Sequence, residues 1–178
     1  MRRGIVTAAA ILISFLLQTS VFDLFKLAGT APNVLLILVV SVAVMRGQKE
    51  GMLTGFFSGL MLDIFYGSWL GGFAFLYMLF GFVGGYFHQI YYSDDNFLPL
   101  VLIGAGDLFY GLIMYLVYGL LQNHMDLLFY LKTIILPETV YTIAVGLLLY
   151  QILLRINDWL EKNQKGSADF VSDFAADQ

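Results

Sequence analysis

Long apolar runs, separated by short polar or charged stretches, constrain the fold of this chain more than any other feature. Of its 178 residues, 60% are hydrophobic and only 12% are charged, whereas soluble domains are roughly 45–50% apolar and about 25% charged. A run of about 18 apolar residues is long enough to cross a ~30 Å hydrocarbon core as a helix. The runs do not alternate as barrel strands do, and an open sheet in lipid leaves backbone groups unsatisfied. The sequence therefore predicts an all-α, polytopic membrane protein.

Six transmembrane helices are expected, and together they form one domain over residues 1–158. The second and third spans would be only about 24 Å long at 1.5 Å per residue, so they tolerate little tilt. The expected spans are Gly4–Phe22, Ala31–Met45, Gly51–Tyr66, Gly71–Tyr91, Phe97–Leu121 and a last one within Leu127–Leu154.

Two prolines bear on where these helices begin. Pro32 suits the first turn of the second span, because its missing N–H would have no partner there in any case. Pro137 interrupts the last span, so that it either kinks one long helix or follows a short interfacial segment, Leu127–Leu136. We favour the interfacial segment.

The distribution of Lys and Arg predicts the orientation of the six spans. With the N-terminus inside, only Lys26 and Lys132 are outside, and all the other basic residues are cytoplasmic. The first apolar run lacks a convincing small-residue cleavage site, so it is interpreted as a retained helix rather than a signal peptide. The polar, acidic segment 159–178 is expected to be a disordered cytoplasmic tail. The cytoplasmic basic residues are Arg2, Arg3, Arg46, Lys49, Arg155, Lys162 and Lys165.

Glycine recurs at every fourth position of the third span, in GMLTGFFSGLMLDIFYGSWLGG. Gly51, Gly55 and Gly59 are followed at the next step by Asp63. Each step of four advances about 400° around a helix, so these four residues share one slowly drifting stripe. Small residues let the backbones of membrane helices approach closely. We interpret the stripe as a helix-packing or partner interface. Asp63 either reaches the outer interface or accepts hydrogen bonds from a facing helix.

A second glycine face and two more acids lie in later spans. Gly81, Gly84 and Gly85 mark a close-packing face on the fourth span. Asp107 lies near mid-membrane within GAGDLFYG, where we expect it to face protein, as a structural hydrogen-bonding group or as a functional site. Glu138 stands at the expected start of the last helix, where an acid is favoured by the macrodipole, so a capping role is expected.

Sequence signatures of catalysis are missing. There is no H-E-x-x-H, G-x-S-x-G or P-loop motif, and the polar residues within the spans do not fall at the spacing of a metal site. The absence of Cys excludes disulfides and thiolate catalysis. We expect no enzymatic activity, no cofactor, no metal and no nucleic-acid partner.

The run APNVLLILVVSVAVMRGQKEGMLTGFFSGLMLDIFYGSWLGG resembles the most characteristic part of the rod shape-determining protein MreD family of the bacterial inner membrane. In that family a Pro-Asp or Pro-Asn pair, here Pro32-Asn33, opens the second span. A G-x-x-x-G-F-x-x-G-x-x-x-D segment follows, and then a Leu-Gly pair, here Leu70-Gly71. The part that bears these motifs is Ala31–Gly85, and length, span count and cytoplasmic termini are similar as well.

This resemblance implies a non-enzymatic scaffold in the machinery that elongates the lateral cell wall. Members of the family act with MreC, a single-pass partner with a periplasmic coiled coil. They link cytoplasmic MreB filaments to the glycan polymerase RodA and its transpeptidase, a class B penicillin-binding protein. We expect MreC to pack near the third span, with Asp63 bonded across that contact or to a neighbouring span.

A second hypothesis comes from the fold that the resemblance implies, which is similar to the six-helix substrate-binding subunits of ECF-type vitamin transporters. Such a subunit needs an outward-facing pocket with several convergent polar groups. The outer loops offer mainly Trp69, Gln122, Asn123 and His124. This poverty of polar groups favours the scaffold over the transport subunit.

Overall fold

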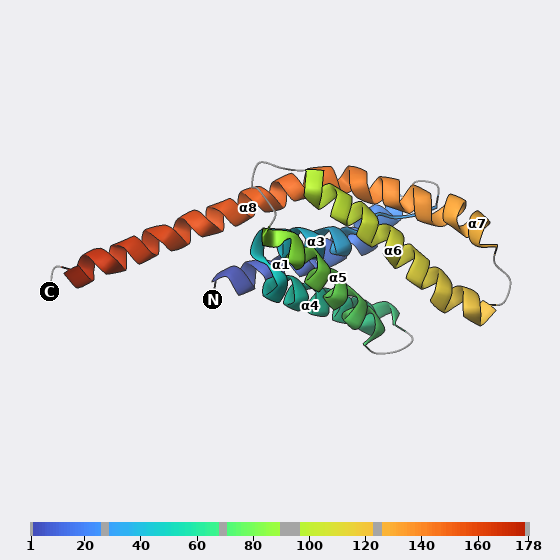
Figure 1. Ribbon diagram of the computed structural model, residues 1–178, viewed down its shortest axis with the longest axis horizontal. Coiled ribbons are helices and arrows are strands. Elements are labelled where there is room, and N and C mark those ends of the chain that lie inside the picture. Colours follow the sequence, from blue (N-terminus) through green and yellow to red (C-terminus); the bar gives the residue numbers. More distant parts are fainter. Residues whose placement is uncertain (1, 26–28, 68–70, 90–96, 123–125, 177–178) are drawn as a thin grey trace.

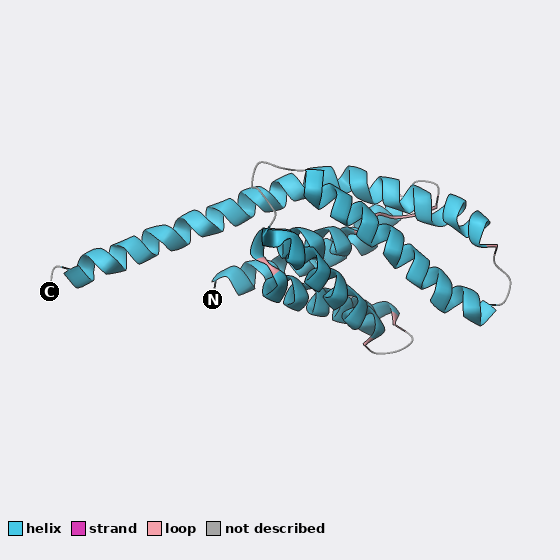
Figure 2. Ribbon diagram, in the orientation of Figure 1, coloured by secondary structure: helices cyan, strands magenta, loops and turns pink. Residues whose placement is uncertain are grey.

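The computed structural model describes residues 2–25, 29–67, 71–89, 97–122 and 126–176, and every regular element among them is helical (Figure 2). The all-α prediction is confirmed for this part of the chain. Leu70 and the expected end of the fourth span at Tyr91 lie outside the described residues. In chain order the elements are α1 (Arg2–Leu16), a π-helical turn (Leu17–Val21), α2 (Phe22–Leu24), α3 (Val34–Arg46), α4 (Gln48–Tyr66), α5 (Gly72–Tyr86), a 3-10 turn (Phe87–Gln89), α6 (Phe97–Gln122), α7 (Leu127–Tyr130), a second π-helical turn (Leu131–Ile135) and α8 (Leu136–Ala176).

Three helical runs in the described residues are long and apolar enough to cross a membrane. They are Arg3–Val21, Phe97–Val117 and Leu127–Leu160, and α3 is a shorter apolar helix. By length and composition, the described part of the chain thus offers three candidate membrane spans. The six-span arrangement itself stays a prediction.

The centre of the bundle is α3. Every residue from Val34 to Met45 is buried, and α3 contacts α1, α4, α5, α6 and α8. Figure 1 shows α1, α4 and α5 gathered around it, with α6 and α8 running along one side. A helix that is apolar on all sides can be satisfied by burial in the middle of a bundle. The second expected span is thus the core of the fold.

The last helical run differs from the interpretation favoured above. The chain is helical from Leu127 onward, with a π-helical turn at Leu131–Ile135 directly before α8, and no separate interfacial segment ends at Leu136. A proline ring clashes with the carbonyl of the preceding turn of an α-helix, and a π-helical turn widens that turn. The structure therefore accommodates Pro137 within one continuous helical run.

The far end of α8 also differs from expectation. The segment 159–178 was expected to be disordered, but the structure describes α8 as a helix through Ala176. Figure 1 shows this part of α8, in red, extending away from the bundle. The polar composition of this segment is consistent with a helix that does not pack against the bundle.

Candidate functional site

The glycine stripe of α4 packs against α5 of the same chain. A Cβ added to Gly55 or Gly59 would collide with the backbone of α5 at Tyr77 or Phe73. At the other end of the contact, Gly51 and Gly81 face each other's backbones. The two glycine faces predicted on successive spans therefore meet each other, with α4 and α5 antiparallel. Since α5 covers the stripe, it is not open to a helix from another protein.

Gly84 and Gly85 extend this second face toward the neighbouring elements. A Cβ at Gly85 would collide with the backbone at Gln48, where α4 begins, and one at Gly84 would press on Ala43 of α3. Close backbone contact of this kind is how membrane helices gain packing energy, because lipid provides no hydrophobic drive between them. The result is a tightly packed unit of α3, α4 and α5.

Asp63 caps the N-terminus of α5. Its carboxylate accepts hydrogen bonds from the backbone N–H groups of Phe73 (3.0 Å) and Ala74 (2.9 Å), and the side chain is only 2% exposed. These are two of the amides that a helix cannot satisfy in its own first turn, and an acid there also favours the helix dipole. Asp63 is therefore bonded to the first turn of a neighbouring helix of its own chain. Being one step beyond Gly59, it lies where α5 begins.

Asn33 organises the start of α3, while Pro32 precedes the helix instead of forming its first turn. The Asn33 side chain accepts hydrogen bonds from the backbone N–H of Leu36 (3.1 Å) and from the hydroxyl of Tyr77 (2.7 Å). The Asn33 N–H donates to the hydroxyl of Thr142 on α8 (3.1 Å). The N-cap thus ties the central helix to α5 and α8 by buried hydrogen bonds.

One more amide of α3 is satisfied from a distance. Gln18, in the first π-helical turn, accepts a hydrogen bond from the backbone N–H of Leu35 (3.0 Å). The sequence does not reveal this role of Gln18, because nothing local shows that its side chain reaches the start of another helix. A helix end inside a bundle needs such partners, since water is not at hand.

Asp107 of α6 and Glu138 of α8 lie within electrostatic reach of each other. Asp107 is buried, and the polar side chains beside its carboxylate are Asn33, Thr139 and Thr142. Glu138 is half-buried and lies within electrostatic reach of Asp107. Because the helical run begins well before Glu138, this residue is not at a free N-terminus, and the expected capping role does not fit its position.

Arg46 links four helices at the basic end of the bundle, which we define by Arg3, Arg46 and Lys49. Its guanidinium donates to Asn157 of α8 (2.7 Å), Thr7 of α1 (3.0 Å) and Glu50 of α4 (3.3 Å), and its side chain is 7% exposed. In the sequence, Arg46 indicates only the orientation of the spans. A fork of donors reaching three partners makes it a structural clamp as well.

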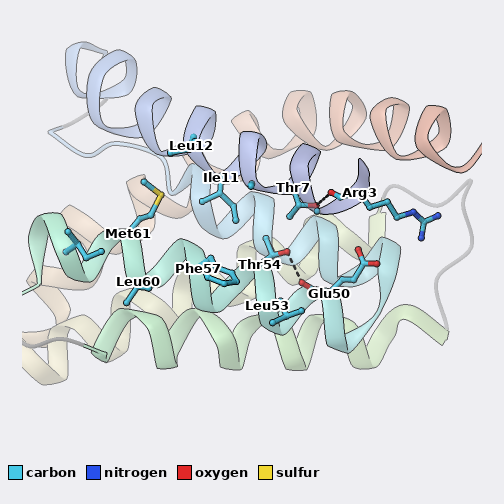
Figure 3. Close-up of a pocket in the computed structure, with 13 residues that line it drawn as sticks. Arg3, Thr7, Ile11, Leu12, Glu50, Leu53, Thr54, Phe57, Leu60 and Met61 are labelled. Atoms are coloured by element: carbon cyan, nitrogen blue, oxygen red, sulfur yellow. Dashed lines mark hydrogen bonds between the residues drawn. The ribbon is translucent and has the colours of Figure 1, made fainter. Parts of the chain in front are cut away.

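A groove of about 510 Å³ runs between α1 and α4. Figure 3 shows Ile11 of α1 on the side toward α4, opposite Phe57 and Met61, with Arg3 and Glu50 at one end. Leu12 and Leu53 also line the groove. The lining is mainly apolar, which suits an apolar occupant rather than a polar substrate.

The two walls of the groove differ in character. On α1 the groove is lined by Gly4 and Ala8, which are four residues apart, and a Cβ at Gly4 would meet no atom of the described residues within 4 Å. On α4 the lining includes Leu53, Phe57 and Ile64, all more than half exposed, on a face other than the glycine stripe. One wall thus permits close backbone approach and the other offers large side chains.

Comparison with known proteins gives a family for this chain. A family model described as rod shape-determining protein MreD matches residues 2–156. No curated protein and no solved structure matches the chain.

Proposed function

Because the chain belongs to the rod shape-determining protein MreD family, and so has a role in rod shape determination, we propose that it acts as a membrane scaffold that binds MreC. In this proposal the chain has six spans in the bacterial inner membrane, with both termini and the basic end in the cytoplasm. Through MreC it couples MreB to the wall-synthesis machinery, which includes RodA and its class B penicillin-binding protein.

The observation that carries this proposal is the groove between α1 and α4, where the single transmembrane helix of MreC would pack. The groove extends along α4 from Glu50 to Ile64, about 21 Å at 1.5 Å per residue, so it follows a helix through most of a hydrocarbon core. Gly4 and Ala8 are both exposed and form a small-x-x-x-small face on α1, and a Cβ at Gly4 would meet no described atom within 4 Å. The glycine stripe of α4 is not available to a partner, because it packs against α5 of the same chain.

Charge at the basic end supports the same occupant. Glu50 pairs with Arg46 (3.3 Å), whereas the buried Nε of Arg3 has no hydrogen-bond partner in the described residues. A partner helix that enters the groove with an acidic or carbonyl group at this end would pair with Arg3. Its apolar side chains would pack on Leu53 and Phe57.

Cysteine crosslinking tests the proposal directly, since the chain has no Cys of its own. Single cysteines at Leu12 and Leu53 are paired with cysteines placed along the transmembrane helix of MreC in cell membranes. We expect crosslinks that recur every three or four residues of the MreC helix. Phe109→Cys, on an exposed apolar position of α6, is the matched control and should not crosslink. Crosslinking at Phe109 but not at the groove positions would place the partner elsewhere.

The transport-subunit hypothesis predicts a different result. Such a protein would not crosslink MreC at any position, and cells that lack it would keep their rod shape while losing uptake of a small molecule. Loss of rod shape on deletion, together with groove-specific crosslinks, is the result expected for the scaffold.

A further inference from the structure

Asp107 is a buried acid that the scaffold does not use. Its side chain is 2% exposed, and neither carboxylate oxygen has a hydrogen-bond partner in the described part of the chain. The hydroxyl oxygen of Thr139, which is 5% exposed, is also buried without a partner. A carboxylate and a hydroxyl buried in this way are costly unless something pairs with them.

The surroundings of Asp107 supply more negative charge than positive. Glu138 on α8 lies within electrostatic reach, and no described Lys, Arg or His pairs with either acid. The other titratable side chain that both acids face is Tyr77 of α5. The N-terminus of α3, capped by Asn33 beside Asp107, contributes roughly half a positive charge. This partial positive charge offsets only part of the negative charge of the two carboxylates.

The helices are packed so that these groups converge. On α6, Gly104 and Gly111 lie one turn to either side of Asp107, and a Cβ at either would collide with the side chains of Ile143 and Ile135 on α8. This close approach brings Thr139, which lies between those two isoleucines in the sequence, beside the Asp107 carboxylate. Acid and hydroxyl oxygens therefore gather at one point between two helices.

We propose that the Asp107 carboxylate, the Thr139 hydroxyl and the Glu138 carboxylate bind one small monovalent metal cation of the Na⁺ type. Oxygen ligands suit hard cations. Mg²⁺ gives up its water reluctantly, and Ca²⁺ takes about six to eight oxygens, more than two carboxylates and one hydroxyl offer. The proposal does not depend on the partner or on the scaffold function.

Thermal unfolding of the purified full-length chain in nanodiscs tests the site. NaCl replaces choline chloride at constant ionic strength, and KCl, MgCl₂ and CaCl₂ are compared in parallel. A cation that binds only the folded chain raises Tm in a saturable way, so we expect NaCl to do so and choline chloride not to. Asp107→Asn should abolish the rise. Asp158→Asn removes an exposed acid from the same α8 and should leave the rise unchanged.

Thr139→Val removes the hydroxyl but keeps the shape of the side chain, and it is the second test variant if Asp107→Asn does not fold. Loss of one coordinating oxygen should raise the half-saturating NaCl concentration at least about tenfold, the lower bound for changes near metal sites. A Tm that is equal in choline and Na⁺, or a Na⁺ effect retained in Asp107→Asn, would overturn the proposal. A Tm that responds to pH but not to Na⁺ would mean that protons balance the charge instead. Saturation by Ca²⁺ or Mg²⁺ but not Na⁺ would refute the monovalent assignment.

Discussion

Replacing Asp63 tests whether one carboxylate holds α4 and α5 together. Its carboxylate accepts hydrogen bonds from the backbone N–H groups of Phe73 and Ala74. In the first turn of a helix such N–H groups have no acceptor within the helix itself. Leaving a buried donor unsatisfied costs about 1–3 kcal/mol. Asp63→Leu should therefore lower the free energy of unfolding by about 2–6 kcal/mol.

Asp63→Asn should be milder, because its amide oxygen can still accept one of the two bonds. Its NH₂ group then faces the other donor, so we expect a loss of about 1–3 kcal/mol. The free energy of unfolding is measured by denaturant titration of the protein in mixed micelles, with Asp158→Leu, at an exposed acid, as the control. The predicted order is wild type, then Asn, then Leu.

Two results would contradict this reasoning. If Asp63→Leu were as stable as wild type, the cap would contribute nothing. If Asn and Leu were equally destabilised, the negative charge rather than the number of hydrogen bonds would govern stability. Neither outcome would bear on the groove, since Asp63 is not among its lining residues.

Three further predictions concern packing, orientation and the basic end. Gly55→Ala places a Cβ against the backbone of α5 and should cost at least about 1–3 kcal/mol in the free energy of unfolding. Gly72→Ala, where a Cβ meets nothing within 4 Å, should be tolerated; equal effects would show that α4 and α5 separate easily. A cysteine at Gln48 should be shielded from an impermeant reagent added outside whole cells and one at Gln122 should react, and the reverse labelling would invert the proposed orientation. Arg46→Lys should lower Tm despite keeping the charge, because an ammonium cannot reproduce the planar fork of donors; a wild-type Tm would reduce Arg46 to a charge at the membrane surface.

Several features of this fold could be predicted from the sequence because they depend on local chemistry. Apolar runs in lipid must satisfy their own backbone, so the helical class follows from composition and length. Small residues that share one face of an apolar helix favour a close backbone contact, so the faces at Gly55 and Gly81 could be predicted from the sequence. The family also follows from motifs within Ala31–Gly85, and the family model covers residues 2–156.

What remained open was the partner of each face. An apolar helix has the same sequence pattern whether lipid or protein surrounds it, so nothing local marked α3 as the buried centre of the bundle. The stripe at Gly55 fitted a partner protein as well as it fits α5. The roles of Gln18 and Arg46 depend on atoms that lie far away along the chain, and so does the proximity of Asp107 to Glu138.

The sequence by itself determined that this chain forms apolar helices with glycine-lined faces, because backbone hydrogen bonding in lipid and the size of a side chain are local properties. Only the tertiary structure decided which faces meet and which stay open. Because α5 covers the stripe at Gly59, Asp63 lies against the first turn of α5. Another face of α4 is then directed toward α1. That choice depends on how the packed helices share their contacts, which is a property of the whole bundle and not of any single segment.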